Sequence, residues 1–202
     1  MEVRAEKFIT FLKERGIACI VFDMDHTMSA HHCGPGLLKI KLKEYVGAAS
    51  KDFVSLATSL ALYNSQKGEK HHFFLAVATG SDPAEYELEG QSRDTHILGP
   101  DLATALIRAT CPASVLPLFK IMVGFDYRLH GKVPNQKGKR KHMRDISKFY
   151  GIPMSKMLII DDSESSLENE EGYHGLLVRN RDVGFTYEDA EFYMQDSVDS
   201  TK

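Results

Sequence analysis

Short runs of consecutive apolar residues recur along the chain and are separated by longer segments of mixed character. The runs are continuous rather than alternating, which is typical of strands that are covered on both faces of a parallel sheet. They occupy residues 17–22, 73–78, 118–123, 157–160 and 175–178. We therefore expect each run to form a buried strand.

Amphipathic segments lie between these runs. Apolar residues recur at helical spacing over residues 1–16, where Gly16 is placed to end the helix, and Ser50 is placed to cap a second helix. Further helices are expected from Gly99 onward and over residues 139–149. Strands that alternate with helices predict an α/β fold with a three-layer, doubly wound parallel sheet.

The length of 202 residues favours a single domain, 1–202. A chain of this size buries roughly 70% of the surface that its unfolded form exposes. No internal repeat or linker divides it. The polar stretch 82–95 is the expected place for a small insertion, and residues 197–202 are expected to form a disordered tail.

The composition indicates which binding partners and which cellular compartment to expect. The chain is 43% hydrophobic and 26% charged with a net charge of −3, so neither a nucleic acid partner nor a membrane segment is expected. The odd set Cys19, Cys33 and Cys111 contains no C-x-x-C pair, which favours a reducing, cytoplasmic location over a disulfide framework. The sequence leaves the oligomeric state open.

Polar residues follow the apolar runs at the positions where strands should end. They are Asp23 and Asp25 after the first run, Thr79-Gly80-Ser81 after the second, and Asp161 and Asp162 after the fourth. In doubly wound sheets ligands bind beyond the carboxyl ends of the strands. Carboxylates that gather at one point repel one another unless a cation compensates, and Mg²⁺ prefers such hard oxygen ligands. A magnesium site is therefore expected.

The same residues suit phosphoryl transfer. A carboxylate such as Asp23 can attack phosphorus and form an aspartyl-phosphate, and Asp25 can serve as general acid and base. Thr79 and a lysine can hold the phosphoryl oxygens. Taken alone, an acidic pair at a strand end is a turn or cap feature, so the prediction depends on all three strand ends.

Three stretches in order resemble the haloacid dehalogenase (HAD) superfamily phosphatases. Asp23-Met24-Asp25-His26-Thr27 is similar to the D-x-D-x-T signature, the second run with Thr79 to the second motif, and Ile159-Ile160-Asp161-Asp162 to the fourth. The resemblance implies a HAD-like Rossmannoid fold and a Mg²⁺-dependent phosphatase. In such an enzyme Asp23 would be the nucleophile and Asp25 the acid/base.

The third motif of this superfamily is a lysine, and Lys137, Lys139 and Lys141 compete for that role. Residues 139–144 resemble the K-x-x-H-(F/M)-R pattern of the magnesium-dependent phosphatase-1 branch, which favours Lys139. The implied phosphate-binding set is Thr79, Gly80 and Lys139. Such a basic cluster is also typical of a solvated helix face.

The resemblance further implies that the cation is held by the carboxylates of Asp23 and Asp162 and by the backbone carbonyl of Asp25. Asp161 would support the site by hydrogen bonding. Many relatives carry another acid about four residues after the metal aspartate, where this chain has Ser166. Glu164 and Glu168 are the residues that could substitute for it.

The spacing between motifs bears on the substrate. Residues 28–72 and 80–138 each hold elements that the core itself requires, so no full cap domain is expected. Capless members of the superfamily tend to act on macromolecules, which favours a phosphoprotein substrate. A lid from 82–95, or a cap supplied by a partner, would instead favour a small metabolite, and a non-catalytic binding module is the third alternative.

Histidines outside these motifs are expected to be structural. His31-His32-Cys33 lacks the partner spacing of a zinc site, and we expect these residues to flank the entrance of the active site. His71-His72 is placed at the entry to a strand. His142 is expected on the helix surface or in a supporting role beside the aspartates.

Overall fold

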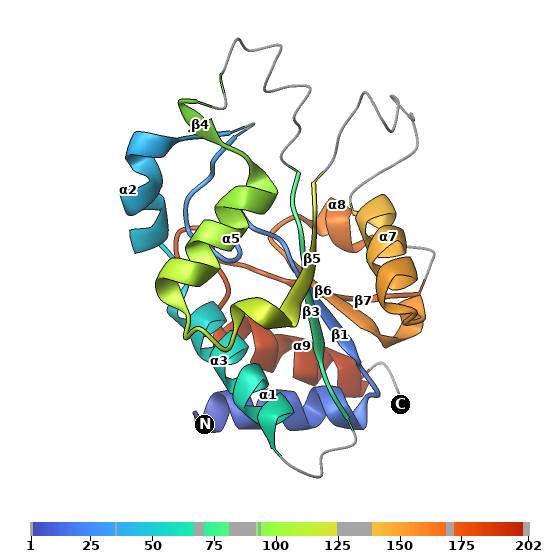
Figure 1. The fold of residues 1–202 in the computed structure, drawn as a ribbon. Coiled ribbons are helices and arrows are strands. Elements are labelled where there is room, and N and C mark those ends of the chain that lie inside the picture. The colour runs from blue at the N-terminus through green and yellow to red at the C-terminus, as the bar shows by residue number, and fades with distance from the viewer. Residues whose placement is uncertain are drawn as a thin grey trace.

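The structure is a computed structural model, and it describes residues 2–34, 36–66, 71–80, 92, 94–124, 139–168 and 172–199. Its centre is a five-stranded parallel sheet with the order β5-β3-β1-β6-β7 (Figure 1). The strands are β1 Cys19–Phe22, β3 Phe74–Ala78, β5 Phe119–Val123, β6 Met157–Asp161 and β7 His174–Leu177. Each of the expected apolar runs therefore forms a strand, and the α/β fold with a parallel sheet is confirmed.

The helices are α1 Val3–Glu14, α2 Leu42–Gly47, α3 Lys51–Ser65, α5 Gly99–Thr110, α7 Arg140–Tyr150, α8 Glu164–Leu167 and α9 Tyr187–Asp199. Short 3₁₀ turns lie at Lys39–Lys41, Leu116–Leu118 and Met154–Lys156. A separate antiparallel pair joins β2 Leu37–Leu38 to β4 His96–Ile97. The sequence pattern did not predict this pair, because two-residue strands leave no periodicity to detect.

Side chains alternate between the two faces of β1 and build two hydrophobic clusters. Ile20 and Phe22 face a cluster that includes residues of α1, α3, α5 and α9, whereas Cys19 and Val21 face a cluster with α7. All four residues of β1 are buried. Helices thus cover both faces of the sheet, which gives the three layers visible in Figure 1.

Local signals fix where several helices begin and end. The Ser50 hydroxyl accepts a hydrogen bond from the Phe53 amide at 3.0 Å and so caps α3. Gly16 and Gly151 follow α1 and α7 with φ angles of 71° and 66°. The final helix reaches Asp199, so 197–199 are helical and the tail expected from 197 onward is shorter than predicted.

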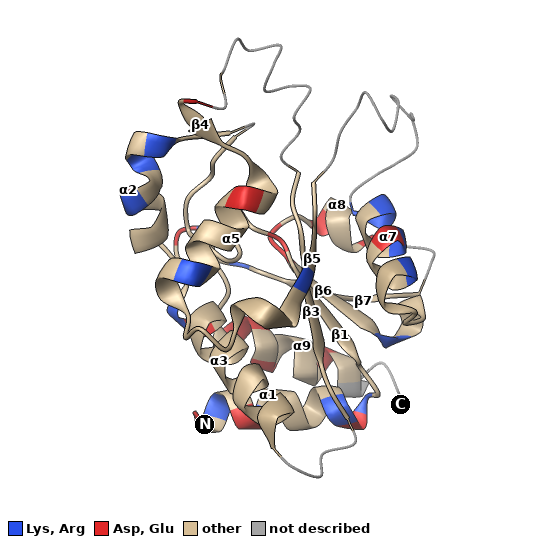
Figure 2. Ribbon diagram, viewed as in Figure 1, with Lys and Arg blue, Asp and Glu red and all other residues tan. Residues whose placement is uncertain are grey.

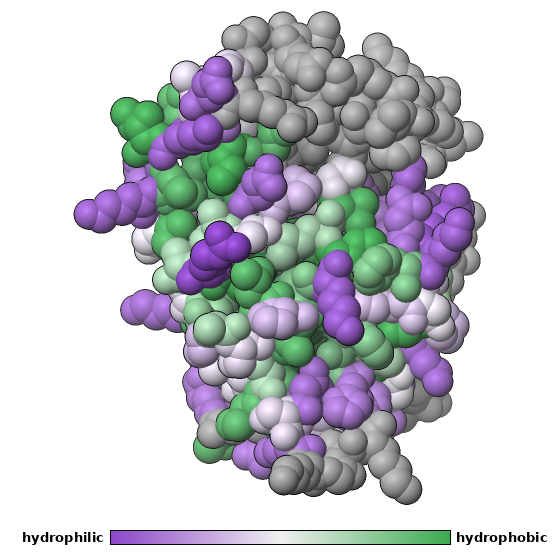
Figure 3. All heavy atoms as spheres, viewed as in Figure 1, coloured by the Kyte–Doolittle hydropathy of each residue, from purple (hydrophilic) through white to green (hydrophobic). Residues whose placement is uncertain are grey.

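Charged residues gather on the outer helices. Basic residues lie on α2 and α7 in Figure 2, and Figure 3 shows hydrophilic side chains over these two helices on the viewed face. Within the described ranges, no helix is long and apolar enough to cross a membrane. Lys137 and all of the stretch 82–95 except residues 92, 94 and 95 lie outside the described residues.

Candidate active site

Register places the strand-end residues side by side. Phe22 of β1 pairs with Val77 of β3 and with Ile160 of β6, and the amide of Asp23 donates to the Ile160 carbonyl at 2.9 Å. The residues that follow these strands therefore emerge at one edge of the sheet. A pocket of about 500 Å³ lies at this edge. Its lining residues are Asp23, Asp25, His26, His32, Gly34, Thr79, Gly80, Lys139, Asp161, Asp162, Ser163, Ser166 and Arg181.

Lys139 lines this pocket and lies immediately before α7. Its ammonium donates hydrogen bonds to Asp23 Oδ1 and, at 2.7 Å, to the carbonyl of Ala78, and it lies 3.8 Å from Asp161 Oδ2. The residue is 8% exposed. Lys141, by contrast, pairs with Asp145 at 2.6 Å along the helix. Of the competing lysines that the structure describes, Lys139 is the one that contacts the nucleophile candidate.

Burial shifts the pKa values of Asp23 and Lys139. Desolvation raises the pKa of Asp23 to about 7, although the Lys139 charge opposes the shift. Desolvation alone would lower the pKa of Lys139, but Asp23 and Asp161 raise it above the ordinary lysine value. Desolvation also raises the pKa of Asp161. The Lys139 ammonium therefore opposes the effect of burial on the pKa of Asp23 without cancelling it.

The carboxylates also fit a divalent cation. Asp23, Asp161 and Asp162 each offer an oxygen, and these atoms lie within 4.8 Å of one another. Asp161 Oδ1 accepts the Ser163 amide at 2.9 Å, whereas its buried Oδ2 has no hydrogen-bond partner among the described residues. Arg181 Nε lies 2.8 Å from Asp162 Oδ2. The oxygen-only donor set and the unsatisfied buried oxygen suit Mg²⁺.

Ser166 faces this cluster where relatives would carry an acid. Its side chain is 5% exposed and lines the pocket together with Asp161 and Asp162. Glu164 and Glu168 are exposed and are absent from the described lining of the pocket. A neutral hydroxyl therefore lies beside the three carboxylates.

Thr79 and His142 fix the end of β3. The Thr79 amide donates to the Val123 carbonyl at 2.9 Å, and the Thr79 carbonyl accepts from His142 Nε2 at 3.1 Å. Burial and the neighbouring Lys139 lower the pKa of His142 to about 3, so the imidazole is neutral and carries its proton on Nε2. Lys139 and His142, one helical turn apart, thus both hold the β3 end. Gly80 lines the pocket with open space where a Cβ would stand.

Asp25 is held by a different part of the chain. The Tyr45 hydroxyl donates to its Oδ1 at 2.8 Å, and the Cys33 amide donates to its Oδ2 at 3.0 Å. His32 Nδ1 lies 2.8 Å from the same Oδ2. His32 lines the pocket, in agreement with its expected place at the entrance. Sequence analysis missed Tyr45, whose only signal is a lone aromatic residue within a lysine-rich segment.

Residues 181–185 pack against the loop that follows β1. His26, with φ 56°, stacks on His32 at 5.7 Å and 8° between planes, and its Nδ1 lies 3.2 Å from the Arg181 carbonyl. The Phe185 amide donates to the Thr27 carbonyl at 2.9 Å. Gly184 has φ +73°, and a Cβ there would lie 2.7 Å from that carbonyl oxygen. The close approach requires glycine.

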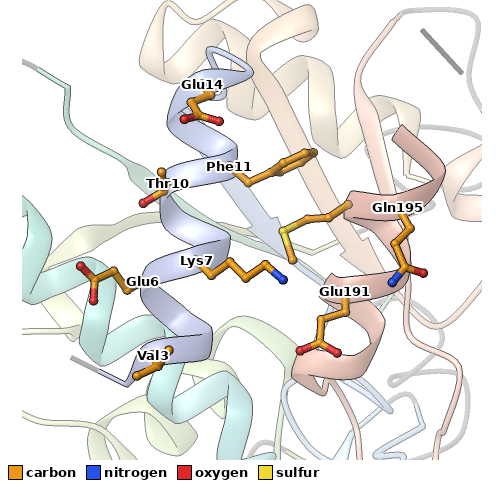
Figure 4. Close-up of a pocket in the computed structure, with 9 residues that line it drawn as sticks. Val3, Glu6, Lys7, Thr10, Phe11, Glu14, Glu191 and Gln195 are labelled. Carbon is orange, nitrogen blue, oxygen red and sulfur yellow. The ribbon is translucent and has the colours of Figure 1, made fainter. Parts of the chain in front are cut away.

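A second, larger cavity of about 770 Å³ lies between α1 and α9 (Figure 4). Its lining combines apolar side chains such as Phe11 and Met194 with scattered charges such as Lys7, Glu14 and Glu191. Figure 4 shows Lys7 and Phe11 extending from α1 toward α9, whereas Glu6 and Thr10 lie on the other side of α1. The chemistry is therefore assigned to the smaller pocket at the strand ends.

Comparison with known proteins adds a structural relative. The chain resembles D,D-heptose 1.7-bisphosphate phosphatase from B. bronchiseptica, solved as a complex with magnesium and phosphate, with a TM-score of 0.52 and 13% identity. The match covers 89% of this chain and 99% of that one. No family model and no curated protein matches the chain. At this identity the likeness shows a shared fold.

Proposed function

We propose that this chain is a Mg²⁺-dependent phosphomonoesterase of the HAD superfamily, of the capless type and similar to the magnesium-dependent phosphatase-1 branch. One observation carries the proposal: Lys139, almost fully buried, contacts Asp23 within a cluster of three carboxylates. Burying this much charge is costly for stability, so such a cluster is typical of a functional site. The match to the D-x-D-x-T signature supports the same proposal.

In the first step an oxygen of the Asp23 carboxylate attacks phosphorus, and the bond from phosphorus to the ester oxygen breaks. Asp25 donates a proton to the departing alkoxide. In the second step Asp25 takes a proton from water, whose oxygen attacks the aspartyl-phosphate and releases inorganic phosphate with Asp23 regenerated. Thr79, Gly80 and Lys139 hold the phosphoryl oxygens throughout.

Asp23, the Asp25 carbonyl and Asp162 are the proposed ligands of the cation, and Asp161 lies close enough to join or support them. When bound, Mg²⁺ supplies positive charge that offsets the carboxylates and the phosphate. Ser166 contributes a neutral hydroxyl in place of an acid. Metal affinity is therefore expected to depend on Asp162 more than in relatives that carry the extra acid.

A phosphoprotein is the first candidate substrate, because the motif spacing leaves no room for a full cap. A small polar metabolite is the second. The described lining of the pocket contains only charged and polar side chains and glycines, which suits a hydroxylated or anionic substrate, and the structural relative is named for a sugar bisphosphate. A binding module without turnover is disfavoured by the presence of both Asp23 and Asp25.

The test is release of inorganic phosphate from a panel of phosphopeptides, sugar phosphates and aryl phosphates, with Mg²⁺ or with EDTA. We expect metal-dependent turnover that Asp23→Asn abolishes and that Asp145→Asn, on the helix surface, leaves unchanged. Preference for peptides or for sugar phosphates decides between the two substrate classes. Absence of metal-dependent release from every member of the panel would overturn the proposal.

A further inference from the structure

Both oxygens of the Asp25 carboxyl are bound by one short segment that lies outside the strand-end motifs. Oδ1 accepts the Tyr45 hydroxyl at 2.8 Å. Oδ2 accepts the Cys33 amide at 3.0 Å and contacts the Cys33 thiol at 3.2 Å. Oδ2 also lies 2.8 Å from His32 Nδ1. Of these partners Tyr45 comes from a helix, α2, which places its hydroxyl on rigid backbone.

Tyr45 is itself tied to the loop that carries Asp25. Its carbonyl accepts the Ser29 hydroxyl at 3.1 Å, and Ser29 forms bridges with both Asp25 and Ala49. The Tyr45 ring is 1% exposed and belongs to the main hydrophobic cluster. The hydroxyl and the carbonyl of one residue therefore fix α2 to both ends of the same loop.

This arrangement matters for proton transfer. A carboxyl that exchanges a proton with a leaving group has to hold its orientation within about 0.5 Å, and a displacement of 1 Å can cost about 100-fold in rate. Asp25 is partly exposed, at 17% of its side chain, so packing alone does not fix its rotamer. Burial and the Asp25 charge raise the pKa of the Tyr45 hydroxyl above its usual range, which keeps it a donor.

We propose that Tyr45 is a positioning residue that, with the Cys33 amide, orients the Asp25 carboxyl for proton transfer to the leaving group. The inference rests on the proposed phosphatase function and adds a residue to it. A purely structural role would also explain a buried hydroxyl that bonds the nearest acceptor. The two roles differ in how the leaving group affects the rate.

The test compares Tyr45→Phe with Tyr187→Phe. Tyr187 is also 1% exposed, and its hydroxyl lies 2.9 Å from the Ser55 hydroxyl. Neither residue is among the described residues that line the pocket, so Tyr187 is a matched control. The substrates are 4-nitrophenyl phosphate and phenyl phosphate. The nitrophenolate leaves readily without a proton, whereas the more basic phenolate depends more strongly on protonation. The ratio of kcat/KM for the two esters reports on proton donation.

Tyr45→Phe is expected to lower kcat/KM for phenyl phosphate about 10- to 100-fold and for the nitrophenyl ester no more than about 3-fold. Tyr187→Phe should change neither. An equal effect of Tyr45→Phe on both esters, or none, would overturn the positioning role while leaving the phosphatase function intact. A wild-type protein that is inactive on both esters and on the wider panel would instead overturn the proposed function, and this inference with it.

A double-variant comparison keeps the test decisive if Tyr45→Phe also lowers stability. Melting temperatures of both tyrosine variants are measured, and Tyr45→Phe is combined with Asp25→Asn. If the hydroxyl acts through Asp25, the double variant should be no slower on phenyl phosphate than Asp25→Asn alone. Full additivity of the two losses would contradict the positioning role.

Discussion

Replacement of Lys139 by methionine tests the electrostatics of the pocket most directly. The substitution keeps the length of the side chain but removes the buried ammonium that contacts Asp23 and lies 3.8 Å from Asp161. Breaking a buried ion pair from one side costs about 3–5 kcal/mol. For a chain of this size each kcal/mol lowers the melting temperature by about 2–4 °C, so the expected fall is about 6–20 °C.

Lys141→Met is the matched control. Lys141 pairs with Asp145 at 2.6 Å along α7, where the side chains are 22% and 43% exposed. Such pairs contribute about 0.3–0.5 kcal/mol, so the melting temperature should change by no more than about 2 °C. The two variants remove the same charge from neighbouring positions. Their difference therefore isolates the buried pair.

The pH dependence of Lys139→Met has a definite sign. Burial already raises the pKa of Asp23 to about 7, and loss of the lysine raises it further. The folded variant then binds a proton that the unfolded chain, with a carboxyl pKa of about 4, releases over this window. Stability therefore falls as pH rises from about 4 through the folded pKa, and the loss should be larger at pH 8 than at pH 5.

The assay is thermal unfolding followed by circular dichroism in EDTA at pH 5 and pH 8, repeated with Mg²⁺. Mg²⁺ should recover part of the stability of Lys139→Met at pH 8, since it offsets the same carboxylates. If Lys139→Met melts within 2 °C of the wild type at pH 8 in EDTA, or if its deficit is larger at pH 5, the reasoning about a charge-compensated cluster is refuted.

Three further outcomes follow from the same geometry. Asp162→Asn should raise the Mg²⁺ concentration needed for half-maximal activity at least about 10-fold, read from a metal titration, and unchanged affinity would contradict its role as a ligand. Gly184→Ala should cost about 1–3 kcal/mol by chemical denaturation, because its φ is +73° and a Cβ would lie 2.7 Å from the Thr27 carbonyl, whereas Gly47→Ala, with open space around it, should not destabilise. The ring signals of His142 should not titrate between pH 5 and 8 by NMR, since burial and Lys139 lower its pKa to about 3; a midpoint near 6.5 would contradict its buried, neutral state.

Much of the fold could be predicted because its strands carry an unambiguous pattern. Continuous apolar runs ending in polar residues, as at Phe22 and Asp23, mark a strand buried on both faces and the edge where it stops. Once the strands are parallel, all such edges coincide. The meeting of Asp23 and Asp161 follows from that topology. Lys139 precedes α7 and follows no strand, so its choice among three lysines depended on the resemblance to the K-x-x-H-(F/M)-R pattern.

The rest depends on contacts that leave no local pattern. Tyr45 is a single aromatic residue on a six-residue helix, and only the folded loop brings its hydroxyl to Asp25. Arg181 follows the last sheet strand in a loop without periodicity, yet it pairs with Asp162. Tertiary packing determines individual long-range side-chain contacts of this kind, and the spacing of residues along the chain does not predict them.

The central place of β1 in the sheet also bears on how the protein folds. Its Cys19 pairs with Phe74 on one side and with Met157 on the other. Both edges of β1 are therefore hydrogen-bonded only after segments far apart in the sequence have come together. Contacts between residues so distant in sequence slow folding, because a long loop must be closed first. No folding intermediate that lacks β6 can bring Asp161 to Asp23. Metal binding during refolding would therefore report when β1 and β6 have paired, and not the formation of either strand alone.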